Sequence, residues 1–413
     1  MQTAIVIIII GLFIFWGHYL NGVFDRKSIP DVLGLMFIGI LLGPIFHLVD
    51  PASFGKFGPL FSNLVLIFIL FESGTDLKIA EIKESFKESA GVTVIGFLTT
   101  WVVISVLCKI IFQLPVLTCL FIGATLGGTS SAVVAGLVKK IAIHPKTSAT
   151  LIIESAETDV FTLAIPLSII TFMTTGQLAT NVIISQFISS LVLALLIGVG
   201  GAFLWSFLIN KFPNFKTTKF STPAFLFILY GMAEYLNFSG PLTALSFGIS
   251  IGNLKYLEPK IIEPIVPNQR IVLPDSEKDF FGQIVFLLRT FFFVFIGLNI
   301  QVNRIDWLIW GAVITFILFL IRILVVKLVV SKQAPVVDKA IISVMIPKGL
   351  GAAVVATLPL QQGLPFGDII QAVCFSVILF STLFCVGLFF LINTGIVMPF
   401  YSFVFKQKDT TQL

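Results

Sequence analysis

Long apolar runs recur from one end of this sequence to the other, and they limit what the chain can fold into. Only 11% of its residues are charged, whereas soluble domains average about 25%. A helix needs about 20 apolar residues to cross the hydrocarbon core of a bilayer. The sequence therefore predicts an all-α polytopic membrane protein, with no room for a soluble regulatory domain.

Splitting the runs at Pro, Gly and charge clusters gives about thirteen expected transmembrane helices. Their expected ranges are 3–20, 31–49, 57–75, 90–113, 115–138, 147–174, 181–210, 221–237, 239–254, 282–300, 305–330, 339–360 and 368–402. An odd number of helices places the two termini on opposite sides of the membrane. The longest loop, 255–278, carries four prolines and is expected to be a connector.

The Lys and Arg residues are distributed unevenly between the two sides. Of 26 basic residues, twenty fall in loops on one side, three on the other side and three within expected helices. The side rich in Lys and Arg is normally cytoplasmic. We therefore expect a multi-pass protein of the cell (inner) membrane with its N-terminus outside and its C-terminus in the cytoplasm. The net charge of +5 then reflects topology rather than a nucleic-acid partner.

Two expected helices contain residues that disfavour an unbroken helix. One contains 123–131, which is rich in Gly and hydroxyl residues, and the other contains 346–351, where Pro347 lacks an amide donor. Interrupted helices in corresponding places of two oppositely oriented halves are typical of inverted-repeat transporters, whose binding site lies where the breaks cross. The alternative is that these small residues only allow tight helix packing.

Three acids, Glu154, Glu157 and Asp159, lie within six residues of the expected helix 147–174. A carboxylate at the centre of a bilayer costs roughly 2.5–3.5 kcal/mol on insertion scales, so such acids usually face a cavity or a partner. Ser155 and Asp159 lie about 40° apart on one helix face, whereas Glu157 points almost opposite to Asp159. Asp159 has the most apolar flanks, so we expect it to bind a cation and a proton alternately.

Oxygen ligands suit a hard monovalent cation such as sodium. The hydroxyls of Ser155, Thr129 and Ser130, with carbonyls freed by the first break, are the candidate ligands that accompany Asp159.

A lysine inside the second break needs a counter-charge, and the expected arrangement is a structural ion pair between Glu154 and Lys348. Glu72 has two readings of equal weight. It either ends the third expected helix at the cytoplasmic surface or lines the entrance to the ion site.

The sequence contains no nucleophile–base set, phosphate-binding loop or metal-ligand spacing, so we expect neither enzymatic activity nor a cofactor. The expected partners are a monovalent cation, a proton and the lipid bilayer. The four cysteines fall inside apolar runs and are expected to be buried small hydrophobes.

Several sequence landmarks resemble those of the sodium/proton exchangers in the monovalent cation:proton antiporter superfamily. Residues 154–159, Glu-Ser-Ala-Glu-Thr-Asp, resemble the Glu-Ser-x-x-Asn-Asp signature of these exchangers, and Pro347-Lys348-Gly349 resembles their Arg-Gly or Lys-Gly element. Residues 34–44, 70–74, 127–131 and 292–298 are similar to further landmarks, in matching order. The resemblance extends nearly from end to end.

This resemblance implies a homodimer with an elevator-like movement. Each protomer would have a dimerisation part, about 1–75 and 221–300, an ion-transport core, about 90–174 and 305–402, and a linker helix, 181–210. By position, Asp159 matches the ion and proton site, and Ser155 and Thr129 match its ligands. Glu154 and Lys348 match the stabilising pair. Glu72 matches an acid that reaches the site in some members.

Thr158, also assigned to the ion and proton site, departs from this pattern. Electroneutral exchangers commonly have Asn at this position and electrogenic ones Asp. With one essential acid, we expect one cation per proton. The sequence thus predicts an electroneutral sodium (or lithium)/proton antiporter, with potassium/proton exchange as the alternative. A sodium-coupled symporter of organic anions on the same architecture and a channel or non-transporting sensor are the remaining alternatives.

Overall fold

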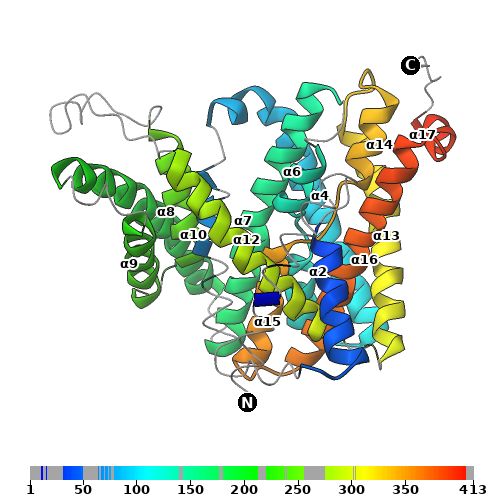
Figure 1. Cartoon of the computed structure of the whole chain (residues 1–413). Helices are drawn as coiled ribbons and strands as arrows, with labels where there is room; N and C mark the ends of the chain where they lie inside the picture. Colours follow the sequence, from blue (N-terminus) through cyan, green and yellow to red (C-terminus); the bar gives the residue numbers. More distant parts are fainter. Residues whose placement is uncertain are drawn as a thin grey trace. The chain divides into compact units, whose positions relative to one another are not determined.

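The described part of the chain is built from helices (Figure 1). The computed structural model describes residues 11–12, 15, 31–49, 64, 67–68, 70–72, 74–75, 79–138, 143–175, 180–212, 220–236, 238, 240–254, 275–300, 302 and 304–405. The expected first helix, 3–20, and the connector 255–278 lie largely outside these residues. Contacts divide the chain into two compact units: unit 1 comprises 1–57, 85–170 and 290–413, and unit 2 comprises 58–84 and 171–289.

Six described helices are long and apolar enough to cross a membrane. They are Ser89–Phe112, Lys146–Thr174, Val192–Lys211, Glu277–Leu298, Ile305–Val329 and Gly367–Asn393. Four shorter apolar helices are Leu33–Ile45, Val116–Thr125, Thr243–Gly252 and Gly351–Gln361. All ten overlap ranges expected from the apolar runs, which confirms the polytopic all-α fold.

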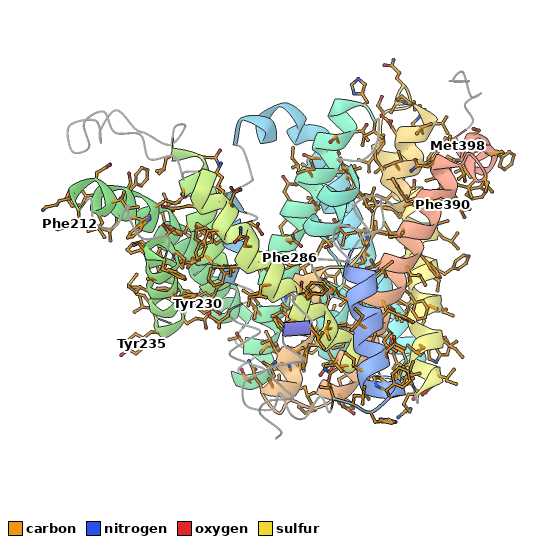
Figure 2. The ribbon with its side chains drawn as sticks, viewed as in Figure 1. Phe212, Tyr230, Tyr235, Phe286, Phe390 and Met398 are labelled. Atoms are coloured by element: carbon orange, nitrogen blue, oxygen red, sulfur yellow. The ribbon has the colours of Figure 1, made fainter. Side chains whose placement is uncertain are left out.

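Large apolar side chains project outward from many of the described helices (Figure 2). Tyr235 is 87% exposed and Phe390 is 64% exposed. Such exposure would be unfavourable in water but suits a surface that faces lipid hydrocarbon.

Unit 1 contains most of the polar side chains identified from the sequence. Its helices are α2 (Asp31–Ile40) continued by η1 (Leu41–Ile45), most of α4 (Ile79–Phe112), α5 (Val116–Thr125), α6 (Ser131–Val138), most of α7 (Pro145–Thr175), the end of α12 (Asp275–Leu298), α13 (Ile305–Val329), α14 (Val336–Val344), α15 (Leu350–Gln361), α16 (Gly367–Asn393) and α17 (Met398–Phe405). The helix α16 packs against α13 and α15. The helices α2 and α12 meet at Gly39 and Gly297, where a Cβ atom on either residue would overlap the backbone of the other helix.

Unit 2 is built around α8 (Thr180–Lys211), α9 (Ser221–Tyr235) and α10 (Gly240–Gly252). The helix α8 packs against both α9 and α10. The hydroxyl of Ser246 donates a hydrogen bond of 2.8 Å to the carbonyl of Leu195, and Trp205 stacks on Phe225 at 4.7 Å between ring centroids. These contacts hold the three helices together.

Both predicted helix breaks are present in unit 1. The first, Leu126–Ser130, separates α5 from α6, and the second, Met345–Gly349, separates α14 from α15. Glycine disfavours the helix in the first break, and a proline without an amide proton does so in the second. Every residue of the two breaks is buried. Irregular backbone at membrane depth requires this shielding from lipid.

Candidate cation-binding site

Four oxygen-bearing side chains share one face of α7: Ser155, Thr158, Asp159 and Thr162. Their spacing of i, i+3, i+4 and i+7 places them on adjacent turns of the same face. The three hydroxyl residues are at most 2% exposed, and Asp159 is half-buried. One carboxylate among hydroxyl oxygens is a set of groups that suits a hard monovalent cation.

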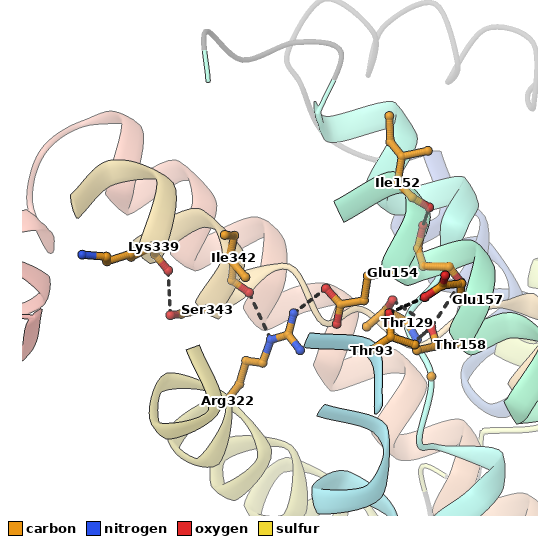
Figure 3. A network of polar contacts seen from close by, with 12 residues as sticks. Thr93, Thr129, Ile152, Glu154, Glu157, Thr158, Arg322, Lys339, Ile342 and Ser343 are labelled. Atoms are coloured by element: carbon orange, nitrogen blue, oxygen red, sulfur yellow. Dashed lines mark hydrogen bonds and ion pairs between the residues drawn. The ribbon is translucent and has the colours of Figure 1, made fainter. Parts of the chain in front are cut away.

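The first break docks onto this face through two threonines (Figure 3). The Thr129 amide donates a hydrogen bond of 3.1 Å to the Thr158 hydroxyl, and the two hydroxyl oxygens lie 3.3 Å apart. The Thr158 hydroxyl also bonds the carbonyl of Ser155 at 3.1 Å. Thr158 therefore satisfies an amide that the break leaves without a helical partner, and it brings Thr129 against the face that carries Asp159.

The two breaks meet each other directly. The Ser130 amide donates to the Pro347 carbonyl at 2.7 Å, and the Lys348 ammonium donates to the Gly128 carbonyl at 2.9 Å. The ammonium thus binds a carbonyl of the first break, three residues after α5 ends at Thr125. The Lys348 amide donates to the Ser381 hydroxyl of α16 at 3.0 Å. The predicted crossing of two broken helices is thus present in unit 1.

The predicted ion pair between Glu154 and Lys348 is not formed. Glu154 instead pairs with Arg322 of α13, with 2.6 Å between carboxylate and guanidinium (Figure 3). These residues are 2% and 5% exposed, and Arg322 also donates from Nε to the Ile342 carbonyl at 3.2 Å. The guanidinium lies beside Gly96 of α4, where a Cβ atom would come within 2.7 Å of it. A planar guanidinium can bond a carboxylate and a carbonyl together, which favours Arg over Lys at this position.

Glu157 points away from Asp159, as the helical period predicts. Its carboxylate accepts a hydrogen bond of 2.8 Å from the Thr93 hydroxyl of α4. Thr93 is buried and Glu157 is half-buried. The acids of α7 therefore have separate environments. Glu154 contacts Arg322 of α13, whereas Glu157 contacts Thr93 of α4.

The remaining predicted site residues are Ser130, in the first break, and Glu72. Ser130 is 3% exposed, and its hydroxyl accepts a long bond of 3.4 Å from the Val133 amide at the start of α6. Glu72 belongs to unit 2, where its carboxylate lies beside Gly282 of α12. Its role at the ion site stays a prediction.

Sequence reasoning missed the parts played by Arg322 and Thr93, and it did not single out Thr162 on the α7 face. The sequence did carry a signal for Arg322, because a charged residue within an apolar helix needs a partner. No comparable signal distinguishes buried threonines, because Thr is common in membrane helices.

A family model described as the transmembrane sodium/hydrogen exchanger matches residues 5–394. The chain belongs to the sodium/hydrogen exchanger family. The sodium proton antiporter MjNhaP1 from Methanocaldococcus jannaschii has a similar fold, with a TM-score of 0.75 at 18% identity over 97% of this chain and 99% of that one. The exchanger family and this fold make the chain a multi-pass membrane protein.

Relatives of this chain carry names for two different cations. The K(+)/H(+) antiporter NhaP2 of Shewanella sp. (strain ANA-3) is 28% identical over 241 residues, which cover 57% of this chain and 41% of that protein. The Na(+)/H(+) antiporter 1 of Methanocaldococcus jannaschii is 22% identical over 328 residues, which cover 74% of this chain and 71% of that protein. The chain therefore spans less than half of the length of the first of these relatives.

Proposed function

We propose that this exchanger is a secondary active antiporter that moves sodium (or lithium) and protons in opposite directions, with Asp159 as the group that binds either ion. The observation that carries the proposal is the face of α7, where Asp159 lies among hydroxyl oxygens beside the break that Thr158 holds. Cation and proton compete for one carboxylate. That competition is the minimal chemistry of exchange.

The neighbouring charges support the choice of Asp159. Glu154 is neutralised by the guanidinium at 2.6 Å, so the pair adds little net charge to the site. Glu157 faces α4. Asp159 is the remaining acid of this stretch, and it lies on the same face as Ser155 and next to Thr158, which contacts Thr129. We propose Asp159, Ser155 and Thr129 as cation ligands, with Ser130 and Thr158 as further members of the site in unit 1.

Potassium is the second candidate cation. The specific observation in its favour is that the relative from Shewanella is named a K(+)/H(+) antiporter. The hydroxyl and carboxylate groups of the site provide oxygen ligands for either ion.

We propose an electroneutral cycle of one cation per proton, carried out by an elevator-like movement within a homodimer. The single carboxylate on this face of α7 supports this stoichiometry. The proposed topology places the N-terminus outside and the C-terminus in the cytoplasm, because most loop Lys and Arg residues then lie inside.

The test is cation-driven proton movement in proteoliposomes. Sodium, lithium and potassium are added in turn, and we expect exchange with sodium and lithium that Asp159→Asn abolishes. Asp306→Asn makes the same chemical change in an exposed pair with Arg304 and should leave exchange unchanged. Exchange with potassium alone would establish the second candidate. Wild-type rates in Asp159→Asn would refute the assignment, and sodium-dependent uptake of an organic anion would refute antiport.

An imposed membrane potential tests the stoichiometry. Each net charge moved is worth about 2.3 kcal/mol per 100 mV, so an electroneutral cycle should keep its rate when the potential is changed.

A further inference from the structure

The Thr162 hydroxyl is buried without a hydrogen-bond partner in the part of the chain that the structure describes. The residue is only 2% exposed. Leaving a buried polar group unsatisfied is unfavourable, and its persistence calls for an explanation such as a bound ion or water. Three other threonine hydroxyls share this condition: Thr118, Thr125 and Thr315.

Thr162 is the member of this group that lies on α7. Viewed down the helix, it is about 60° from Asp159 and about 20° from Ser155. A Cβ atom on Gly128 would overlap the Thr162 hydroxyl, so this oxygen lies against the first break. Its position combines the two features of the proposed site, the Asp159 face and the irregular backbone.

The other hydroxyls on this face are already engaged. Thr158 bonds the Thr129 amide and the Ser155 carbonyl. Ser155 donates its proton to the Ile152 carbonyl at 2.9 Å and keeps its lone pairs for a cation. The Thr162 hydroxyl keeps both its lone pairs and its proton, so it is the most available of the three hydroxyls for binding an ion.

We propose that Thr162 is a further oxygen ligand of the transported cation, one turn beyond Asp159. The proposal rests on the proposed function. A rise of 1.5 Å per residue separates Ser155 from Thr162 by about 10 Å along the helix, which one cation cannot bridge. Asp159 lies between them. The cation therefore has two positions on α7, one shared by Asp159 with Ser155 and one shared by Asp159 with Thr162.

Thr162→Val removes the hydroxyl and keeps the shape, whereas Thr162→Ser keeps the hydroxyl. In sodium-driven exchange, we expect Thr162→Val to raise the apparent KM for sodium about three- to ten-fold, since a lost ligand of about 1 kcal/mol corresponds to about five-fold. The maximal rate should stay within about two-fold of wild type, and Thr162→Ser should return KM to within about two-fold. Thr315→Val, which removes another unpartnered buried hydroxyl, should leave KM unchanged.

Thermal unfolding in detergent, with and without sodium, provides a second readout. Thr162→Val should be at least as stable as wild type without sodium, because it removes a buried hydroxyl that has no partner, and it should gain less stability when sodium is added. An unchanged KM in Thr162→Val, or a raised KM that Ser does not restore, would overturn the ligand role. Wild-type protein that shows no exchange would instead refute the proposed function, before any variant is compared.

Discussion

The two helix breaks are alike in how their backbone amides are hydrogen-bonded, but they differ in the other contacts that hold them in place. In each, a side-chain hydroxyl from an unbroken helix accepts a hydrogen bond from a break amide: Thr158 of α7 for Thr129, and Ser381 of α16 for Lys348. The helix before the second break is also held by charge, because Arg322 bonds the Ile342 carbonyl of α14 while it pairs with Glu154.

This difference indicates a division of roles between hydroxyls and charges. Hydroxyls satisfy the orphan amides, at about 1 kcal/mol for a typical hydrogen bond. Buried charges anchor α14 to α7 and are costly to leave unpaired. Losing a charge should therefore affect stability more than losing a hydroxyl, and the variants below test this order.

Arg322→Met should have the largest effect on stability. It leaves Glu154 buried without a counter-charge, so the free energy of unfolding should fall by roughly 3–5 kcal/mol in an SDS titration of the micellar protein. Adding Glu154→Gln should recover much of this loss, because no uncompensated charge remains. A loss below about 1 kcal/mol in Arg322→Met would show that the pair does not anchor α14.

Thr158→Val should have an intermediate effect. It removes the partner of the Thr129 amide and a contact with the Thr129 hydroxyl, so we expect a loss of about 1–3 kcal/mol in the same titration. Ser168→Ala is the matched control, since the Ser168 hydroxyl bonds only a carbonyl of its own helix at 2.7 Å. Equal losses in the two variants would contradict the role of Thr158 at the break.

Ser381→Ala should have a smaller effect, near the lower end of about 1–3 kcal/mol, because one amide loses its partner while the charge contacts around α14 remain. Thr382→Val offers a neighbouring control, as its hydroxyl bonds the Ile378 carbonyl within α16 at 2.9 Å. If Thr382→Val proved the more damaging of the two, the second break would not depend on the Ser381 hydroxyl.

Arg304→Met should have the smallest effect. The Arg304–Asp306 pair has the same chemistry as the buried pair at a similar distance of 3.0 Å, but both side chains are more than half exposed. Exposed pairs are screened by water and salt. We expect no measurable change in the SDS titration, and a loss comparable to that of Arg322→Met would contradict the importance of burial.

The sequence allowed much of this arrangement to be predicted. Apolar runs located the helices, Gly-rich and Pro-containing segments located both breaks, and the helical period separated Asp159 from Glu157. These features depend on local chemistry, and the structure confirms the fold and the breaks.

The partner of Glu154 was not predictable in the same way. Glu154 and Arg322 are 168 positions apart. The three basic residues within expected helices are Arg289, Arg322 and Lys348, and the sequence alone does not distinguish between them as partners of Glu154. The choice of Arg322 depends on the tertiary structure, which brings its guanidinium to Glu154 and beside Gly96. The Thr129–Thr158 contact and the unpartnered Thr162 hydroxyl likewise depend on how the first break folds back, which residue spacing does not specify.

The most direct test of the central claim is the number of protons released when sodium binds to the purified protein. Titration calorimetry in buffers of different ionisation enthalpy measures this number, at a pH where wild-type protein binds sodium in competition with protons. Competition at Asp159 predicts proton release with sodium binding in wild type and neither event in Asp159→Asn. Sodium binding with undiminished proton release in Asp159→Asn would contradict the account.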